Sequence, residues 1–244
     1  MISDSMARIL RVLQPTEGSD TIADVVTAAG ARAMGVDGLA VSLVTEGDLA
    51  ELLWCSDATT RRFEDLQFTL GQGPGPDAIR TGAMVWAPDL AQVPLARWPA
   101  LVMEAPALDT RAVFCFPMSI GAINVGVLTA VRRTPGPMTA QQTDDATILA
   151  AALTARCLGS STPQPGTPFP ADSPHSLQHA VVHQATGMLS VQLALTLPQA
   201  LLRLRAHAYG SGRSITDISQ DVVDRRLHLD PGGNSTPPTA EDKD

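Results

Sequence analysis

The feature that most constrains the fold is a proline-rich stretch in the second half of the chain. Residues 159–174 hold five prolines and two glycines in 16 residues, with no helical or strand-like repeat. Proline lacks a backbone N–H and has a fixed φ, so such a stretch cannot continue a helix or lie inside a sheet. We therefore expect a linker at residues 159–173. It separates folded units at residues 1–158 and 174–229, and a disordered acidic tail follows at residues 230–244.

The composition fits packed domains and argues against a fibrous or disordered chain. The protein has 244 residues, of which 44% are hydrophobic and 17% are charged. At about 150 residues per domain, this length predicts one or two domains. The formal net charge of -8 means that the protein as a whole is not built to coat a polyanion, so only a local basic face could bind nucleic acid.

Cysteine usage and hydropathy indicate a cytoplasmic protein. Cys55, Cys115 and Cys157 lie far apart and form no CxxC pair, which argues against a disulfide framework and favours a reducing compartment. No stretch approaches 18 uncharged apolar residues, so we expect no signal peptide and no membrane contact.

The N-terminal unit alternates helical and strand-like patterns, which predicts an α+β fold with a helix-flanked antiparallel sheet. Apolar residues at helical spacing mark three segments, at residues 6–13, 22–34 and 139–157. Short β-prone runs mark four strands, at residues 39–45, 49–54, 111–118 and 123–132. Glu46-Gly47-Asp48 between the first two strands is typical of a hairpin with a three-residue loop.

A set of short motifs in this unit resembles the GAF sensor domain of actinobacterial regulators. They are Trp54–Asp57, Leu66–Gly82 with its GxGP stretch, Asp89, Trp98-Pro99, Phe116-Pro117 and Gly126–Leu128. The resemblance covers about residues 20–158 and implies a sensor for an unknown small molecule or protein signal. Gly75 stands where relatives often carry Cys, so thiol chemistry tied to that position is absent.

Aromatic residues give the candidate sensor pocket. Phe114, Phe116 and Met118 share one face of a strand because they alternate, and a GAF-like sheet commonly packs an apolar pocket on one face. The tryptophans that could line the same pocket are Trp54, Trp86 and Trp98. The alternative is that all six residues are ordinary core.

No catalytic, metal or cofactor site is recognisable in the sequence. Residues 1–158 contain no histidine, and the cysteines fit no haem-binding motif. The charged run that includes Arg61, Arg62, Glu64 and Asp65 is typical of a solvated helix face. We therefore expect no cofactor, no metal and no enzymatic activity.

The C-terminal unit shows three helical patterns and predicts a small all-α bundle. The first runs from about Pro174 to Leu195, with Ser173 as its N-cap. The second and third begin at the capping boxes Thr196–Gln199 and Ser214–Asp217.

Three runs in this unit look like the ANTAR domain, a three-helix RNA-binding module of antitermination regulators. They are Gln184–Leu189, Ala200–Ala208 and Arg213–Val223. The resemblance implies a homodimer that binds paired hexanucleotide hairpin loops in nascent RNA, so that a terminator does not form. This chain departs from the family pattern at Thr186, where Lys is usual, and at Ser219, where Ala is usual.

The resemblance and the residue chemistry together give candidate RNA contacts. Arginines can clamp phosphates or stack on unpaired bases, whereas glutamine and threonine can hydrogen-bond to bases or backbone. Glycine allows a close approach, either of RNA or of a neighbouring helix. The candidates are Gln184, Thr186, Gly187, Arg203, Arg205 and Arg213.

These observations lead to two hypotheses about function. The first is a signal-responsive, non-enzymatic regulator that binds structured RNA and promotes transcription antitermination. The second is a ligand-sensing protein-interaction module whose ANTAR-like unit has lost RNA binding. Thr186 and the weak basic balance of the C-terminal unit motivate the second hypothesis.

Overall fold

The computed structural model describes residues 2–12, 29–44, 50–159, 179–229 and 235–236. The chain divides into two compact units, Met1–Ser176 (the N-terminal unit) and Leu177–Asp244 (the C-terminal unit). Several predicted segments lie outside the described residues: the helix at 22–34 before residue 29, the hairpin loop at 46–48, the linker from residue 160 onward, and most of the tail.

The N-terminal unit is built on one antiparallel sheet of five strands in the order β2-β1-β5-β4-β3. The strands are β1 (Gly38–Val44), β2 (Ala50–Cys55), β3 (Val85–Ala87), β4 (Ala112–Ile120) and β5 (Ile123–Arg132). Four of them lie within two residues of the predicted strands. The edge strand β3 was not predicted, because three residues are too few to show an alternating pattern.

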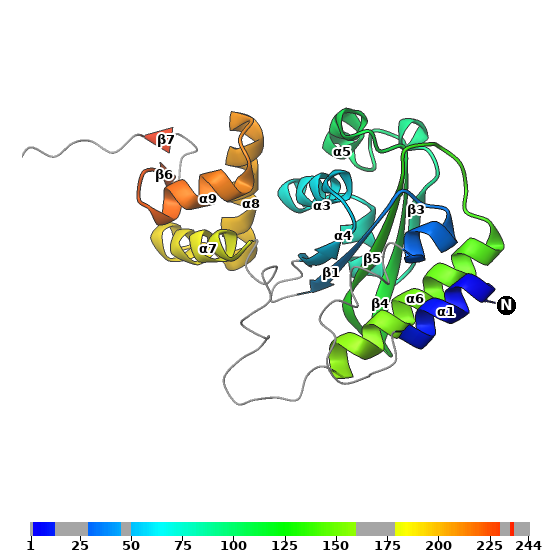
Figure 1. The fold of residues 1–244 in the computed structure, drawn as a ribbon. Helices are drawn as coiled ribbons and strands as arrows, with labels where there is room; N and C mark the ends of the chain where they lie inside the picture. Colours follow the sequence, from blue (N-terminus) through cyan, green and yellow to red (C-terminus); the bar gives the residue numbers. More distant parts are fainter. Residues whose placement is uncertain (1, 13–28, 45–49, 160–178, 230–234, 237–244) are drawn as a thin grey trace, which may run out of the picture. The chain divides into compact units, whose positions relative to one another are not determined.

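One face of the sheet is covered by α1 (Asp4–Val12), a helical segment at residues 29–34 and α6 (Ala140–Gly159), as Figure 1 shows for α1 and α6. The core on this face includes Met6, Met34 and Leu149 from the helices, and Phe114 and Leu128 from the sheet. The register sets Phe114 opposite Ala130 on β5, so alternate residues of both strands face the same helices.

The other face packs against α3 (Ala58–Leu70), α4 (Pro74–Thr81), α5 (Pro99–Glu104) and the 3₁₀ turns Leu90–Gln92 and Ala105–Leu108. Its core includes Phe63, Trp98 and Leu101. The indole Nε1 of Trp98 donates to Asp77 Oδ2 at 3.0 Å, so the buried ring keeps a polar partner.

A buried polar cluster ties α3 to this face of the sheet. The side chain of Glu64 is only 7% exposed. Its Oε2 accepts from Ser42 Oγ on β1 and its Oε1 accepts from Gln67 Nε2, each at 3.0 Å. Thr129 on β5 also bonds to this carboxylate. The expectation of a solvated helix face is therefore wrong for Glu64, which lies on the inward side of α3.

The cluster continues from Glu64 into α4 and β4. Gln67 Oε1 accepts from the Gly75 backbone N–H at 2.8 Å, and Cys115 Sγ donates to Thr129 Oγ1 at 3.6 Å. Burial raises the pKa of Glu64 to about 7, although the hydrogen bonds from Thr129, Ser42 and Gln67 act in the opposite direction. Glu64 is thus a carboxyl whose charge changes near neutral pH.

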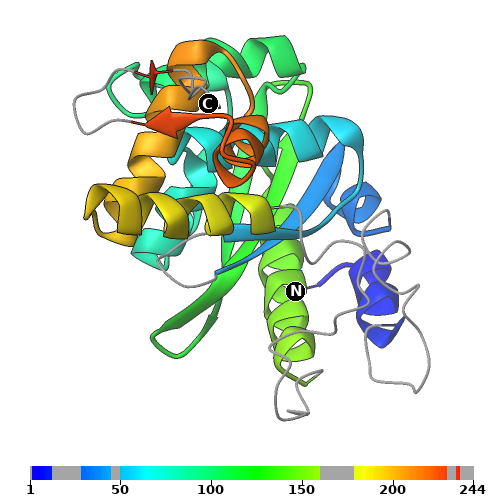
Figure 2. The ribbon, with the colours of Figure 1, turned by 90° about the vertical axis from the view of Figure 1, so that its left-hand side faces the viewer.

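The described residues of the C-terminal unit form three helices and a short pair of antiparallel strands (Figures 1 and 2). The helices are α7 (Ala180–Leu193), α8 (Leu197–Ser211) and α9 (Ile215–Val223), and β6 (His228–Leu229) pairs antiparallel with β7 (Ser235–Thr236). The buried hydrophobic residues of the three helices are Val182, Ala185, Leu189, Ala200, Leu201, Leu204, Ala208, Ile215, Ile218 and Val222. This confirms the predicted class, a helix-flanked antiparallel sheet followed by an all-α unit.

The starts of α8 and α9 follow the predicted capping signals, whereas α7 begins after His179 and the predicted N-cap Ser173 lies outside the described residues. Thr196 and Gln199 form a capping box at the start of α8, and Ser214 Oγ accepts from the Asp217 N–H at the start of α9. The chain turns by 109° between α7 and α8. In the described residues, no single helix has the length and apolar composition of a membrane span. The bent pair of α7 and α8, taken together, has that length and composition.

Candidate nucleic-acid interface

The outward side of α8 carries the residues best placed to meet another molecule. We call it the α8 outer face and define it as Leu202, Arg203, Arg205, Ala206 and Tyr209. Leu202 is 66% exposed and Tyr209 is 52% exposed, whereas the inward residues of α8 are buried in the core. Since Leu202, Arg205 and Tyr209 are spaced at i, i+3 and i+7, they share one side of the helix.

Both predicted arginines of α8 lie on this face, and both are partly buried. Burial lowers the pKa of Arg205 to about 10, which still leaves the guanidinium charged at neutral pH. A partly desolvated cation is less screened by salt than a fully exposed one, so it attracts a phosphate more strongly.

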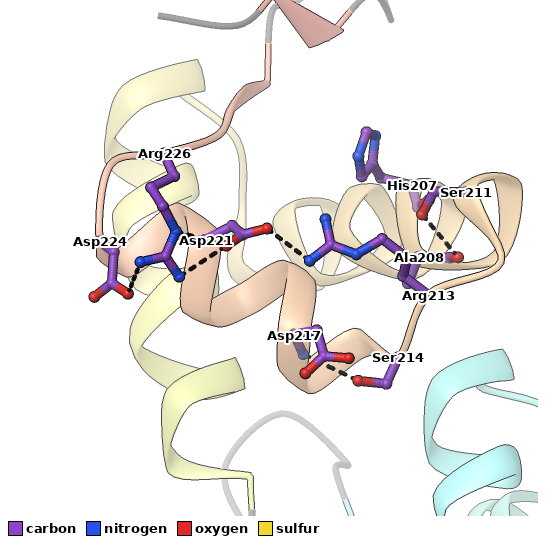
Figure 3. A network of polar contacts seen from close by, with 9 residues as sticks. All are labelled: His207, Ala208, Ser211, Arg213, Ser214, Asp217, Asp221, Asp224 and Arg226. Carbon is purple, nitrogen blue, oxygen red and sulfur yellow. Dashed lines mark hydrogen bonds and ion pairs between the residues drawn. The ribbon is translucent and has the colours of Figure 1, made fainter.

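Arg213 lies in the turn between α8 and α9, and its position is fixed by capping. Gly212 ends α8 in the left-handed conformation at φ 64°, which favours glycine. Ser211 Oγ donates to the His207 carbonyl oxygen at 2.8 Å. Together with the Ser214 cap on α9, these bonds hold the short turn and place the Arg213 side chain beside α9 (Figure 3).

A carboxylate on α9 binds two arginines (Figure 3). Arg213 Nη2 donates to Asp221 Oδ2 at 2.7 Å, and Arg226 Nε donates to Asp221 Oδ1 at 2.9 Å. Arg226 also pairs with Asp224 at 2.7 Å. The bonds from Arg213 and Arg226 lower the pKa of Asp221. Arg213 therefore reaches the surface with part of its hydrogen-bonding capacity already used by Asp221.

The predicted contacts on α7 are placed differently from one another. Gln184 is exposed, and a Cβ added at Gly187 would meet no atom within 4 Å. Thr186 is buried, and its hydroxyl donates to the Val182 carbonyl oxygen at 2.7 Å. The structure therefore places Gln184 and Gly187 on the surface. It corrects the expectation for Thr186, because helix periodicity turns that residue inward.

Ser219, the second departure from the family pattern, is also in the interior. It lies on α9 and is fully buried. Its Oγ has no hydrogen-bond partner within the described part of the chain. A buried hydroxyl without a partner destabilises the folded state, so Ser219 is a weak point of the bundle.

The six candidate sensor residues do not come together at one site. Trp54, Phe114, Phe116 and Met118 belong to the core cluster under α1 and α6. Trp98 lies in the cluster on the opposite face of the sheet, and Trp86 is 53% exposed on the edge strand β3. Sequence periodicity placed Phe114, Phe116 and Met118 on one face correctly, but it could not tell which face each tryptophan would reach.

Metal and thiol chemistry find little support in the described residues. No group of three or more His, Cys, Asp or Glu side chains there could hold a metal ion. Burial raises the pKa of Cys115 well above its usual range and also raises that of Cys55 and Cys157. These thiols are therefore poor nucleophiles at neutral pH.

Comparison with known proteins finds a similar protein or family model for each unit. The family model of the ANTAR domain matches residues 177–223. The GAF domain of an Acinetobacter phosphoenolpyruvate-protein phosphotransferase is similar at 15% identity and TM-score 0.51, over 64% of this chain and 92% of that one. The GAF domain of the Coxiella burnetii phosphoenolpyruvate-protein phosphotransferase is similar at 14% identity and TM-score 0.49, over 65% and 96%.

No curated protein matches the chain. At 15% identity the likeness to a solved GAF domain shows the fold of the N-terminal unit and nothing about its ligand. The chain therefore joins a unit of the GAF fold to a segment that matches the ANTAR domain model.

Proposed function

We propose that this protein is a cytoplasmic, non-enzymatic regulator that binds paired hairpin loops in nascent RNA and promotes transcription antitermination. The single observation that carries the proposal is the ANTAR domain at residues 177–223, whose α8 presents Arg203 and Arg205 on its outer face. The N-terminal unit would respond to a small molecule or protein signal, and the regulator would act as a homodimer.

The proposed RNA contacts divide by chemistry. Arg203 and Arg205 would neutralise phosphates or stack on splayed bases, and Arg213 would contribute one further phosphate contact while it keeps Asp221 as a partner. Gln184 would hydrogen-bond to the loop, and Gly187 would let the backbone of the RNA approach α7. Thr186 supports this surface from within, because its hydroxyl is bonded to α7 itself.

The charge count predicts how binding depends on salt. Residues 179–229 contain five arginines and three aspartates, and two of those arginines bind Asp221. Each phosphate contact on a single strand contributes about -0.7 to the slope of log K against log salt concentration. The three proposed arginine contacts, Arg203, Arg205 and Arg213, therefore predict a slope of about -2, so binding should weaken as the salt concentration rises.

Binding of the full chain to a two-hairpin RNA tests the proposal. The RNA carries two six-nucleotide loops, and the control RNA keeps both stems but has scrambled loops. We expect preference for the intact loops, and a loss of about fivefold or more in Arg205→Ala with a shallower salt slope. Arg8→Ala, which removes an exposed cation from the N-terminal unit, is the matched control. Equal and feeble binding to both RNAs would overturn the proposal.

The second candidate is a protein-interaction module that has lost RNA binding. The exposed apolar residues Leu202 and Val191 favour it, since large apolar side chains on a surface often mark protein contacts. The double variant Arg205→Ala, Arg213→Ala separates the two functions. If RNA is the partner, this double variant abolishes the regulatory effect. If a protein is the partner, the regulatory effect stays intact.

A further inference from the structure

Tyr209 is a surface aromatic that the core of the C-terminal unit does not use. It is the single tyrosine of the chain and lies in the last turns of α8, 52% exposed. The inward side of α8 is already filled by Ala200, Leu201, Leu204 and Ala208. A large ring left half in solvent next to a complete core is available to a partner.

The neighbours of Tyr209 on the helix indicate the chemistry of that partner. Arg205 precedes it by four residues and Leu202 by seven, so both lie on the same side of α8. Leu202 is 66% exposed, and Arg203 follows it on the flank of the face. The α8 outer face thus combines an apolar and aromatic centre with two guanidinium groups.

We propose that Tyr209, together with Leu202, is a stacking platform for an unpaired base of the RNA loop, and that Arg205 contacts the adjacent phosphate. The inference rests on the proposed function. Proteins that bind unpaired nucleotides alternate aromatic faces for the bases with cations for the phosphates, and one turn of helix supplies both here. The two positive charges on this face favour RNA over an apolar protein surface, because they attract the phosphates of the RNA backbone.

Substitutions at Tyr209 in the full chain test this platform with the two-hairpin RNA. Tyr209→Phe keeps the ring and should bind within about twofold of the wild type, whereas Tyr209→Ala should bind about tenfold more weakly or worse. The slope of log K against log salt concentration should be the same for Tyr209→Ala as for the wild type, because no charge is lost. Arg205→Ala should make this slope shallower. Leu197→Ala removes another exposed apolar side chain of α8, 54% exposed, and should leave binding unchanged.

Abasic loops then identify the stacked base. Each loop nucleotide in turn is replaced by an abasic one, and at one position the wild type should bind no better than Tyr209→Ala, since the base that stacks is gone. Thermal unfolding of Tyr209→Ala by circular dichroism should match the wild type, because the ring is outside the core.

Three results would overturn the inference. Tyr209→Ala could bind the intact loops as tightly as the wild type, or Tyr209→Phe could lose as much affinity as Tyr209→Ala, which would assign the effect to the hydroxyl. Alternatively, Tyr209→Ala could change the oligomeric state in light scattering while single-site RNA affinity is kept, which would assign the face to a second copy of the chain. If the wild type itself does not distinguish intact from scrambled loops, the proposed function fails as well.

Discussion

Replacing Glu64 by Gln should remove a pH-dependent loss of stability from the N-terminal unit. Glu64 accepts hydrogen bonds from Ser42, Thr129 and Gln67 in a buried site between α3 and the sheet. A glutamine has nearly the same shape and stays neutral at every pH. Its amide can use the same partners, because the Ser42 and Thr129 hydroxyls can accept as well as donate.

The magnitude follows from the two pKa values of the carboxyl. The ordinary value of 4.5 applies to the unfolded chain, and burial raises the pKa to about 7 in the folded state. The folded state therefore binds the proton more tightly, and the contribution of Glu64 to stability is greatest below pH 4.5. This stabilising contribution falls as the pH rises from 4.5 to about 7. Above that pH, titration of Glu64 no longer changes the free energy of unfolding. A pKa difference of this size corresponds to about 3 kcal/mol of unfolding free energy.

Urea unfolding followed by tryptophan fluorescence measures this effect in the full chain. Trp54, Trp86 and Trp98 all lie in the N-terminal unit, so the signal reports on that unit alone. Between pH 4.5 and pH 8, the wild type should lose about 3 kcal/mol relative to Glu64→Gln. Glu104→Gln, at an exposed position of the same unit, is the control and should follow the wild type. Parallel stability curves for the wild type and Glu64→Gln would refute the reasoning.

Three further predictions concern single positions. Ser219→Ala should stabilise the C-terminal unit by about 1 kcal/mol, since it removes a buried hydroxyl that has no partner among the described residues. Hydrogen exchange measures this stability, and a loss of stability would show that the hydroxyl has a partner. Gly187→Ala and its control Gly210→Ala should each raise helix stability by about 0.5–1 kcal/mol. Only Gly187→Ala should weaken RNA binding, and equal RNA affinity of the two variants would exclude a close approach of the RNA at Gly187. Asp57→Ala should cost about 1–2 kcal/mol at neutral pH, because the Asp57 carboxylate caps α3 through the Thr59 and Thr60 amides. Burial alone would raise the pKa of the Asp57 carboxyl, but its hydrogen bonds lower that pKa below 3.8 in the folded state. The deficit should therefore shrink in urea titrations as the pH falls below about 4, and a constant deficit would argue against the cap.

The sequence was sufficient for the elements whose residues repeat with a clear period. The four predicted strands lie within two residues of the expected ends, and α8 and α9 begin at the predicted capping boxes. Ser214 illustrates why: a hydroxyl at an N-cap satisfies a backbone donor locally, so its effect does not depend on the rest of the fold.

Which side chains are buried, and which of them pair with one another, was harder to predict from the sequence. Glu64 reads as a surface charge beside Arg61 and Arg62, and only the packing of α3 on the sheet shows that it points inward. Thr186 was a candidate RNA contact because its hydroxyl can hydrogen-bond, whereas in the structure that hydroxyl bonds to the Val182 carbonyl oxygen and the residue is buried. The paired cations on Asp221 depend on the turn after α8 and the residues after α9, which no local pattern brings together.

The tryptophans show a second limit. Trp98 and Trp54 are both buried, but they belong to clusters on opposite faces of the sheet. Which face a side chain reaches depends on strand register and on the connecting turns, and a one-residue shift in register reverses it. Composition could identify the aromatic residues but could not group them.

Single-round transcription through a terminator tests the central claim most directly. The template encodes the two-hairpin RNA so that its second hairpin overlaps the terminator stem, and read-through is measured with increasing amounts of the full chain. We expect read-through to rise with the wild type, to rise much less with Arg205→Ala, and not to rise on a template with scrambled loops. Unchanged termination at protein concentrations that saturate the RNA, or equal read-through on both templates, would contradict it.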